Sequence, residues 1–161
     1  MPLEKTEAAK LLTEIVLLTF RLERGFINAA DAISAPAGLG AARWKVLGAV
    51  LYEPRTVPEI GRVMGLSRQA VQRLANVLVE DGLCAFKDNP AHKSAKLLDK
   101  TPAGRAAVDQ IADRQTMWSS KVSDGLTTAR LVACRRILRE LIDRVENSKN
   151  VVLEEDASNL H

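Results

Sequence analysis

Two short helices joined by a tight turn are the feature that most restricts the fold of this chain. In the segment TVPEIGRVMGLSRQAVQRL, Thr56 and Glu59 have the spacing of a capping box, in which two side chains satisfy free N–H groups at a helix start. Ser67 is placed to cap the next helix. Gly65 and Gly82 suit the two helix ends, because glycine adopts the left-handed backbone conformation at little cost. The segment therefore predicts a pair of helices joined by the turn MGLS.

The second of these helices has two chemically different faces. Leu66 and Val71 flank its N-cap with the spacing of a hydrophobic staple. The side chains expected on the buried face are Val71, Leu74, Ala75 and Leu78. The side chains expected on the opposite, polar face are Arg68, Gln69, Gln72, Arg73 and Asn76. A solvated surface would explain this face, and so would a helix that reads base edges in the major groove of DNA.

Helical periodicity extends over most of the remaining chain. A first helix is expected over residues 3–33, and its middle, EIVLLTF, is apolar nearly all round, which a helix exposed to water would not tolerate. A second helix is expected over residues 41–52. Thr101 and Pro102 begin a long helix to about residue 124, and Thr127 begins a last helix to about residue 146.

A β-hairpin is predicted between the second short helix and Thr101. The segment LCAFKDNPAHKSAKLLDK contains a short strand after Gly82, a turn centred on Asp88, Asn89 and Pro90, and a returning strand over residues 96–98. The order of elements is therefore helix, helix, two short helices, hairpin and two helices.

Positive charge is concentrated in the middle of the chain. The net charge is +3, but residues 40–105 contain eleven Lys or Arg and six Asp or Glu, a balance of +5 that leaves −2 for the remainder. Such a distribution permits a nucleic-acid partner without requiring one.

The cysteines and the apolar runs indicate a reducing, cytoplasmic location. Cys84 and Cys134 lie far apart among apolar neighbours, so no disulfide framework is indicated, and Cys84 is expected to be a small core residue. The start of the chain, MPLEKTEAAK, is unlike a signal peptide, and no apolar run approaches the roughly 20 residues of a membrane span. We therefore expect no membrane partner.

Catalysis is disfavoured by the residues that the chain lacks. The two histidines, His92 and His161, lie in a turn and at the terminus. No metal-ligand cluster, phosphate-binding loop or nucleophile motif appears in the sequence. We expect no catalytic residue, no metal site and no cofactor.

In this order, the helix-turn-helix and the hairpin after it resemble the MarR family of winged-helix transcription regulators. The resemblance covers about residues 11–146 and is carried by ARWKVLGAV, TVPEIGRVMGLSRQAVQRLANVLVEDGL and TPAGR. It implies a mainly α fold with a small β-wing. The implied domains are an N-terminal dimerisation helix (1–34), a winged helix-turn-helix domain (35–100), C-terminal dimerisation helices (101–146) and a flexible tail (147–161).

The resemblance also implies a homodimer that binds double-stranded DNA. Two helices of the kind that follows Ser67 would enter the major groove about 34 Å apart, at a palindromic operator. The residues implied in DNA binding are Ser67, Arg68, Gln69, Gln72, Arg73, His92, Lys93 and Lys96. The wing departs from the family pattern, because His92, Lys93 and Ser94 stand where many members carry Asp, Arg and Arg. We expect Lys93 or Lys96 to contact phosphates instead.

Many members of the family are released from DNA by small aromatic or anionic ligands. The residues that could line such a pocket are Phe26, Trp44, Met117 and Trp118, although each also suits a core or a dimer interface. Redox-sensing members carry a cysteine in the first helix, and residues 11–26 contain none. Thiol sensing is therefore disfavoured.

Two functions remain in contention. The leading hypothesis is a homodimeric, sequence-specific DNA-binding transcription regulator that acts as a ligand-responsive repressor. The alternative is a winged-helix dimer that binds proteins and has lost specific DNA binding. The altered wing tip favours the alternative, whereas Arg68 and Arg73 argue against it, because a protein-binding face would more often be apolar.

Overall fold

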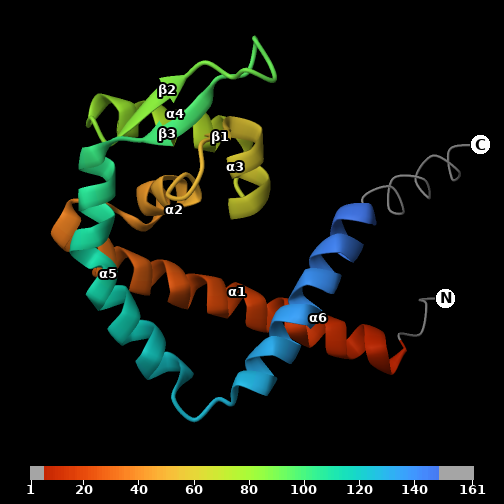
Figure 1. Cartoon of the computed structure of the whole chain (residues 1–161). Coiled ribbons are helices and arrows are strands. Elements are labelled where there is room, and N and C mark those ends of the chain that lie inside the picture. Colours follow the sequence, from red (N-terminus) through yellow and green to blue (C-terminus); the bar gives the residue numbers. More distant parts are fainter. Residues whose placement is uncertain (1–5, 149–161) are drawn as a thin grey trace, which may run out of the picture. The chain divides into compact units, whose positions relative to one another are not determined.

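The computed structural model describes residues 6–148 as a mainly helical chain with one small antiparallel sheet (Figure 1), which confirms the predicted fold class. The chain forms two compact units, and the boundary between them falls after Met117, within α5. Residues 1–5 and 149–161, which include most of the predicted tail, lie outside the described residues. In chain order the elements are α1 (Glu7–Ser34), the 3₁₀ turn η1 (Ala35–Ala37), α2 (Ala41–Ala49), β1 (Arg55–Thr56), α3 (Val57–Met64), α4 (Arg68–Glu80), β2 (Cys84–Lys87), β3 (Leu97–Lys100), α5 (Pro102–Ser123) and α6 (Thr128–Asn147).

The predicted helix boundaries that depend on local capping are confirmed. At Thr56 and Glu59 both halves of the capping box form, and the Glu59 carboxylate accepts a hydrogen bond from the Thr56 N–H at 2.7 Å. The other helix-starting residues behave in the same way. A backbone N–H three residues later donates a hydrogen bond to the hydroxyl of Ser67, of Thr101 and of Thr127. The glycines predicted to end helices, Gly65 and Gly82, have φ values of 64° and 72°, and Gly125 after α5 has a φ value of 74°.

Three segments differ from the sequence-based expectation. Helix α2 ends at Ala49 rather than at Tyr52, because the N–H groups of Val50 and Leu51 bond to carbonyls three residues back and tighten the chain into a turn. Strand β1 was not predicted, because two residues are too few to show an alternating pattern. The connection between β2 and β3 also spans residues 88–96, which is wider than the predicted turn.

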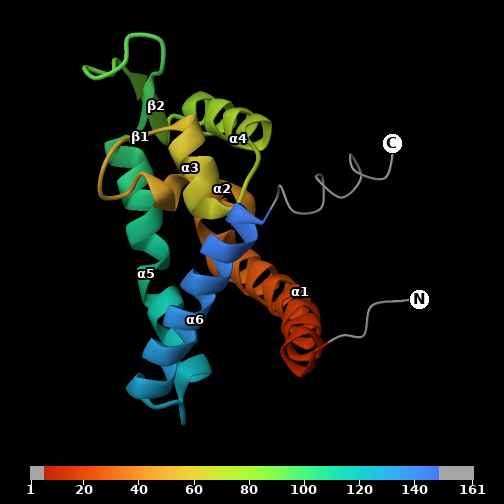
Figure 2. The same ribbon diagram turned by 90° about the vertical axis from the view of Figure 1, so that its right-hand side faces the viewer.

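The three strands form an antiparallel sheet in the order β1-β3-β2. Phe86 pairs with Leu98, and Cys84 pairs with Lys100. Directly opposite residues share a face, so Ala85 and Asp99 lie on the face opposite to Phe86 and Leu98. The loop over residues 88–96 projects beyond the ends of β2 and β3 (Figures 1 and 2). This hairpin is the wing that the sequence predicted.

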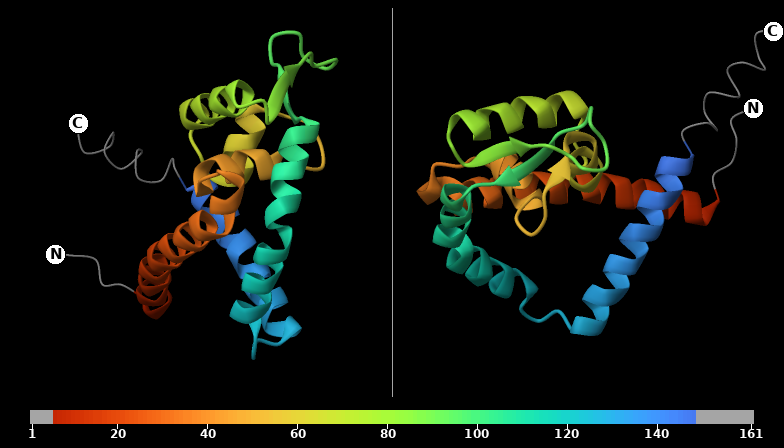
Figure 3. Two further views of the ribbon diagram at one scale, coloured as in Figure 1. Left: turned by 90° about the vertical axis from the view of Figure 1, so that its left-hand side faces the viewer. Right: turned by 45° about the horizontal axis from the view of Figure 1, so that its top comes forward.

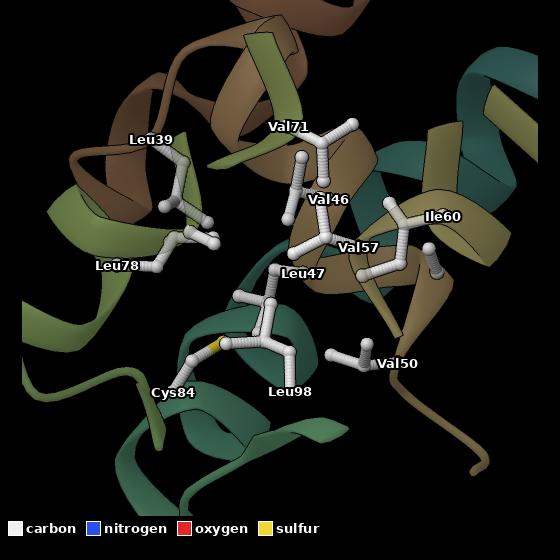
Figure 4. Close-up of a cluster of buried hydrophobic side chains, with 12 residues drawn as sticks. Leu39, Val46, Leu47, Val50, Val57, Ile60, Val71, Leu78, Cys84 and Leu98 are labelled. Carbon is white, nitrogen blue, oxygen red and sulfur yellow. The ribbon is translucent and has the colours of Figure 1, made fainter. Parts of the chain in front are cut away.

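One hydrophobic core lies between α2, α3, α4 and the sheet (Figure 4). Its fully buried side chains are Val46, Leu47, Val50, Ile60, Val71, Ala75, Leu78 and Leu98. The predicted buried face of α4 is therefore confirmed, with Leu74 half-buried beside it. This packing fixes one side of α4 and leaves the other side at the surface of the first unit (Figure 3).

The start of α5 is pressed against the turn that follows α4. The hydroxyl of Thr101 donates to the carbonyl of Gly82 at 2.7 Å, and its N–H donates to the carbonyl of Leu83 at 3.0 Å. A Cβ atom at Gly104 would lie only 2.0 Å from that same Leu83 oxygen. Glycine is therefore required here by a close backbone contact, not by an unusual φ angle.

Helices α1 and α6 expose long apolar surfaces. Of the described residues of α1, only Ile33 and Ser34 are buried. Its large apolar side chains that are more than a third exposed are Leu11, Leu12, Ile15, Val16, Leu17, Leu18, Phe20, Leu22, Phe26 and Ile27. Those of α6 are Leu131, Val132, Ile137, Leu138, Ile142 and Val145. Over residues 6–148, no helix has the length and apolar character needed to cross a membrane.

Candidate nucleic-acid interface

The polar face of α4 is open to solvent along its first three turns. Arg68, Gln69, Gln72 and Arg73 are all exposed, as the sequence predicted. The amide of Gln72 donates a hydrogen bond to Asn76 at 3.0 Å, which orients the Gln72 side chain along the helix. Four long polar side chains therefore project from one side of a helix whose other side is anchored in the core.

Ser67 has a structural role at the start of this face. Its hydroxyl oxygen accepts a hydrogen bond from the N–H of Ala70 at 3.1 Å and caps α4. The hydroxyl hydrogen is not used by this bond and can still be donated to an acceptor outside the protein. Ser67 thus sets where the helix begins and so positions Arg68 and Gln69.

A hollow of about 340 Å³ separates the first turns of α4 from the wing. It brings together three predicted site residues, Arg68 and Gln72 from α4 and Lys96 from the wing. The residues that complete its lining are Thr56, Val57, Pro58, Phe86, Ser94 and Ala95. Sequence reasoning did not assign Thr56, Pro58 or Phe86 to the site, because their proximity depends on how α3 and β2 pack.

The basic side chains of the α4 face and the wing tip form no ion pair with any acidic residue in the part of the chain that the structure describes. Arg43, Arg55, Lys87, Lys100 and Arg105 all form ion pairs with nearby carboxylates. In contrast, no ion pair within residues 6–148 involves the basic residues of the α4 face and wing tip, which are Arg68, Arg73, Lys93 and Lys96. The basic side chains of the first unit that form no ion pair within residues 6–148 therefore include those predicted to contact DNA.

The wing tip presents its two predicted residues directly to solvent. His92 and Lys93 are exposed in the loop between the strands. The loop is shaped by backbone hydrogen bonds from His92 to Asn89 and from Ala95 to His92, each 3.2 Å long. Neither tip residue lines the hollow beside α4. The tip and the α4 face are thus separate parts of one surface.

Asp99 is a residue of the wing that sequence reasoning missed. It is buried on β3, and its carboxylate pairs with Lys87 on β2 and with the neighbouring Lys100. Burial opposes its ionisation, but the hydrogen bonds and charges of the two lysines outweigh burial and lower the pKa of Asp99. Asp99 follows the returning strand predicted over residues 96–98, so its diagonal pairing with Lys87 emerges only from the observed bounds and register of β2 and β3.

Cys84 lies in the core, as expected from the sequence. It is 2% exposed at the start of β2. Burial, together with the negative charge of Asp99, raises the pKa of this thiol to about 11. The thiolate, which is the reactive form, is therefore scarce near neutral pH.

The four candidate ligand-binding residues are distributed over both units. Phe26 lies on the exposed part of α1, Trp44 is half-buried on α2 against the core, and Met117 is 73% exposed on α5. Trp118 is the first residue of the second unit. None of the four lines the hollow beside α4. Among the described residues, no group of three or more His, Cys, Asp or Glu is placed to hold a metal ion.

A helix-turn-helix with an exposed second helix, followed by a two-stranded wing, defines a winged-helix protein. A family model described as "MarR family" matches residues 37–93 of the chain. An uncharacterised protein of Mycobacterium tuberculosis is 35% identical over 136 residues, which are 84% of this chain and 92% of that protein. The chain therefore belongs to the MarR family of winged-helix regulators.

Several solved structures share this fold. The M. tuberculosis transcriptional regulator MosR in complex with DNA gives a TM-score of 0.69 at 23% identity, covering 83% of this chain and 97% of that chain. A mutant of Escherichia coli MarR complexed with operator DNA gives 0.69 at 19% identity, covering 84% and 99%. CouR from Rhodococcus jostii, bound to p-coumaroyl-CoA, gives 0.73 at 22% identity, covering 80% and 91%.

Proposed function

We propose that this protein is a homodimeric transcription regulator that binds a palindromic DNA operator and acts as a ligand-responsive repressor. The observation that carries the proposal is the exposed face of α4, where Arg68 and Arg73 lack acidic partners among the described residues. Polyanion binding requires available positive charge, and sequence reading requires long hydrogen-bonding side chains on an exposed helix. Both requirements meet on this one helix.

In the proposed complex, α4 lies in the major groove. Arg68 and Arg73 can bond guanine edges or phosphates, and Gln69 and Gln72 can bond adenine edges. Ser67 donates its free hydroxyl hydrogen to a phosphate at the groove edge. In this arrangement Ser67 contacts a phosphate at the start of α4, and the residues after it can read bases.

The wing is proposed to bind the DNA backbone rather than to read bases. Ser94 is too short to enter the minor groove, but Lys93 and Lys96 are long, exposed and without acidic partners in the described part of the chain. Lys96 and Arg68 both line the hollow, so the two cations are proposed to bind one stretch of phosphates. His92 at the tip adds a hydrogen-bond donor to the same backbone.

A second copy of the chain is proposed to cover the apolar surfaces of α1 and α6. A continuous row of exposed apolar side chains such as Leu11, Leu18 and Leu22 marks an interaction surface on a chain of this size. A two-fold dimer would place two α4 helices about 34 Å apart, one DNA turn, which matches a palindromic operator.

The proposed effector is a small aromatic or anionic molecule that lowers DNA affinity. Support comes from a fold neighbour, CouR, which is described as bound to p-coumaroyl-CoA. Phe26, Trp44, Met117 and Trp118 are the side chains proposed to line its pocket. A ligand that binds the free dimer more tightly than the DNA-bound dimer would release the operator.

The test is fluorescence anisotropy with DNA from upstream of the protein's own gene and with a scrambled duplex, each at two salt concentrations. The variant Arg68→Ala/Arg73→Ala removes two cations of α4 that form no ion pair within residues 6–148, whereas Arg105→Ala removes a cation that is already paired within α5. Selective, salt-sensitive binding that only the first variant loses supports the proposal. Equal weak binding of the wild-type protein to both duplexes would favour a protein-interaction dimer, the function that the altered wing tip at Ser94 suggests.

A further inference from the structure

We infer that Arg43 is a positioning residue that fixes the angle of α4 relative to the corner between α1 and α2, residues 35–40. It does so by connecting the C-terminal end of α4 to that corner. This inference rests on the proposed function, because its consequence is a preference for one spacing between operator half-sites. It concerns a contact that lies at the opposite end of α4 from Arg68.

The connection consists of the guanidinium group of Arg43 and two partners, Asp81 and Gly38. From the first turn of α2, Arg43 forms an ion pair of 2.7 Å with Asp81, the residue that caps the C-terminus of α4. Its other terminal nitrogen donates to the carbonyl of Gly38, in the corner between α1 and α2. The planar, forked guanidinium holds both partners in a fixed geometry, which a lysine at this position could not do.

Hydrogen bonds from the last turn of α1 hold the corner and the start of α2 in place. A carboxylate oxygen of Asp31, on the last turn of α1, accepts a hydrogen bond from the N–H of Ala41 at 2.6 Å. Asp31 thereby caps α2, whose own N-cap residue, Gly40, has no side chain for this purpose. The buried hydroxyl of Ser34 donates to the carbonyl of Leu39 at 2.9 Å and closes the corner from inside.

Helix α5 is attached to the same corner within the first unit. The guanidinium of Arg114 donates to the carbonyl of Ala32 at 3.1 Å, and the amide of Gln110 donates to the carbonyl of Pro36 at 3.3 Å. The end of α1, the start of α2 and part of α5 therefore form one connected assembly. Arg43 extends this assembly to the C-terminal end of α4, in addition to the hydrogen bonds of Thr101 with Gly82 and Leu83 just after that helix.

The placement of Asp81 is unfavourable unless Arg43 is present. The C-terminal end of a helix carries partial negative charge, so a carboxylate there is repelled. The side chains of Arg43 and Asp81 are 30% and 43% exposed, and ion pairs with such exposure contribute little to overall stability. The pair is therefore better suited to fixing an orientation than to holding the fold together.

The consequence concerns the distance between the two α4 helices of a dimer. If α1 provides the dimer contact, one connection that sets this distance runs through α1, residues 35–40, Arg43 and Asp81, beside the core packing of α4. Without the two contacts of Arg43, α4 keeps its core contacts and its base-reading side chains, but its angle to the corner is less restricted. Base preference within each half-site should then persist while the preference for one spacing weakens.

The experiment is a selection of bound duplexes from a randomised DNA library, followed by affinity measurements on the selected sites with one base pair added or removed between half-sites. The variants are Arg43→Leu and Asp81→Asn, the second of which retains the shape of the side chain. The control is Arg105→Leu, which removes an Arg–Asp pair within α5. Circular dichroism and thermal melting establish that each variant is folded.

For Arg43→Leu and Asp81→Asn, we expect discrimination between the best spacing and the altered spacings to fall roughly three- to tenfold, as coupling energies between contacting residues allow. The half-site sequence should be unchanged, and Arg105→Leu should behave as the wild-type protein. Unchanged spacing discrimination in Asp81→Asn would overturn the inference while leaving the proposed function intact. Failure of the wild-type protein to select any sequence would instead overturn the proposed function, and with it this inference.

Discussion

The ammonium group of Lys87 on β2 lies 2.5 Å from the carboxylate of Asp99 on β3, so the two strands of the wing are joined by an ion pair as well as by backbone hydrogen bonds. Lys100 approaches the other carboxylate oxygen at 3.3 Å. Lys87, Lys100 and Asp99 together carry a net positive charge at the base of the wing, and Asp99 is the common partner of the two lysines.

We expect the charged form of Asp99 to stabilise the fold. Because its pKa is lower in the folded chain than in the unfolded chain, its contribution is present above the unfolded pKa of about 3.9 and is lost as the pH falls through the folded value. Asp99→Asn should reduce stability at pH 7 and flatten the loss of stability between pH 5 and pH 3. Urea denaturation at several pH values measures this, with the exposed Asp109→Asn as control. Parallel pH curves for Asp99→Asn and the wild-type protein would contradict the expectation.

Gly104→Ala should destabilise the protein by roughly 1–3 kcal/mol or more, because its Cβ would collide with backbone that cannot move freely. The added atom would lie 2.0 Å from the Leu83 carbonyl oxygen. Gly48→Ala is the matched control, since a Cβ at this helical position meets no atom within 4 Å. That change should stabilise the protein by up to about 1 kcal/mol through helix propensity. Equal urea midpoints for the two variants would show that the contact at Leu83 relaxes easily.

Arg73→Ala should weaken operator binding by roughly 1–3 kcal/mol if Arg73 contacts a base edge. The variant should keep its oligomeric state and its melting temperature, because the side chain is exposed and forms no ion pair within residues 6–148. Anisotropy titrations and light scattering measure the two properties. Wild-type affinity in the variant would remove Arg73 from the interface.

Lys93→Ala should reduce the slope of log affinity against log salt concentration by about 1, the value for the loss of one phosphate contact. Its effect on affinity should be similar for all DNA sequences, because a phosphate contact carries no sequence information. Titrations at four or more salt concentrations give the slope. The same measurement on Lys87→Ala provides a comparison with a lysine that is already paired with Asp99. An unaltered slope in Lys93→Ala would place the wing tip away from the backbone.

Cys84 should resist alkylation in the folded protein. With a pKa of about 11, only about one thiol in a thousand is ionised at pH 8, and burial also blocks access of the reagent. Iodoacetamide labelling followed by mass spectrometry of the Cys84 peptide measures this. The same labelling in 6 M guanidinium chloride serves as the positive control. Rapid labelling under native conditions would mean that β2 opens readily.

Features determined by neighbouring residues could be predicted from the sequence. The caps at Thr56, Ser67, Thr101 and Thr127 need only residues a few positions away, and each was placed correctly. The buried face of α4 could be predicted for the same reason, because apolar residues at helical spacing define a side before any tertiary contact forms.

Features that depend on distant segments could not be predicted. Strand β1 exists because Arg55 and Thr56 meet β3, more than forty residues later. The ion pair of Arg43 with Asp81 spans 38 residues, and neither residue has a local pattern that indicates the other. The lining of the hollow beside α4 likewise depends on the packing of Pro58 and Phe86. Such contacts result from the three-dimensional arrangement rather than from any short motif.

The exposed apolar row of α1 has a consequence for the amount of active protein. If a second copy covers this row, folding and assembly are linked, and stability rises with the concentration of the chain. The DNA-binding form then increases roughly with the square of chain concentration at low abundance. A regulator built in this way has a threshold of expression below which its operator stays empty, without any separate inhibitor.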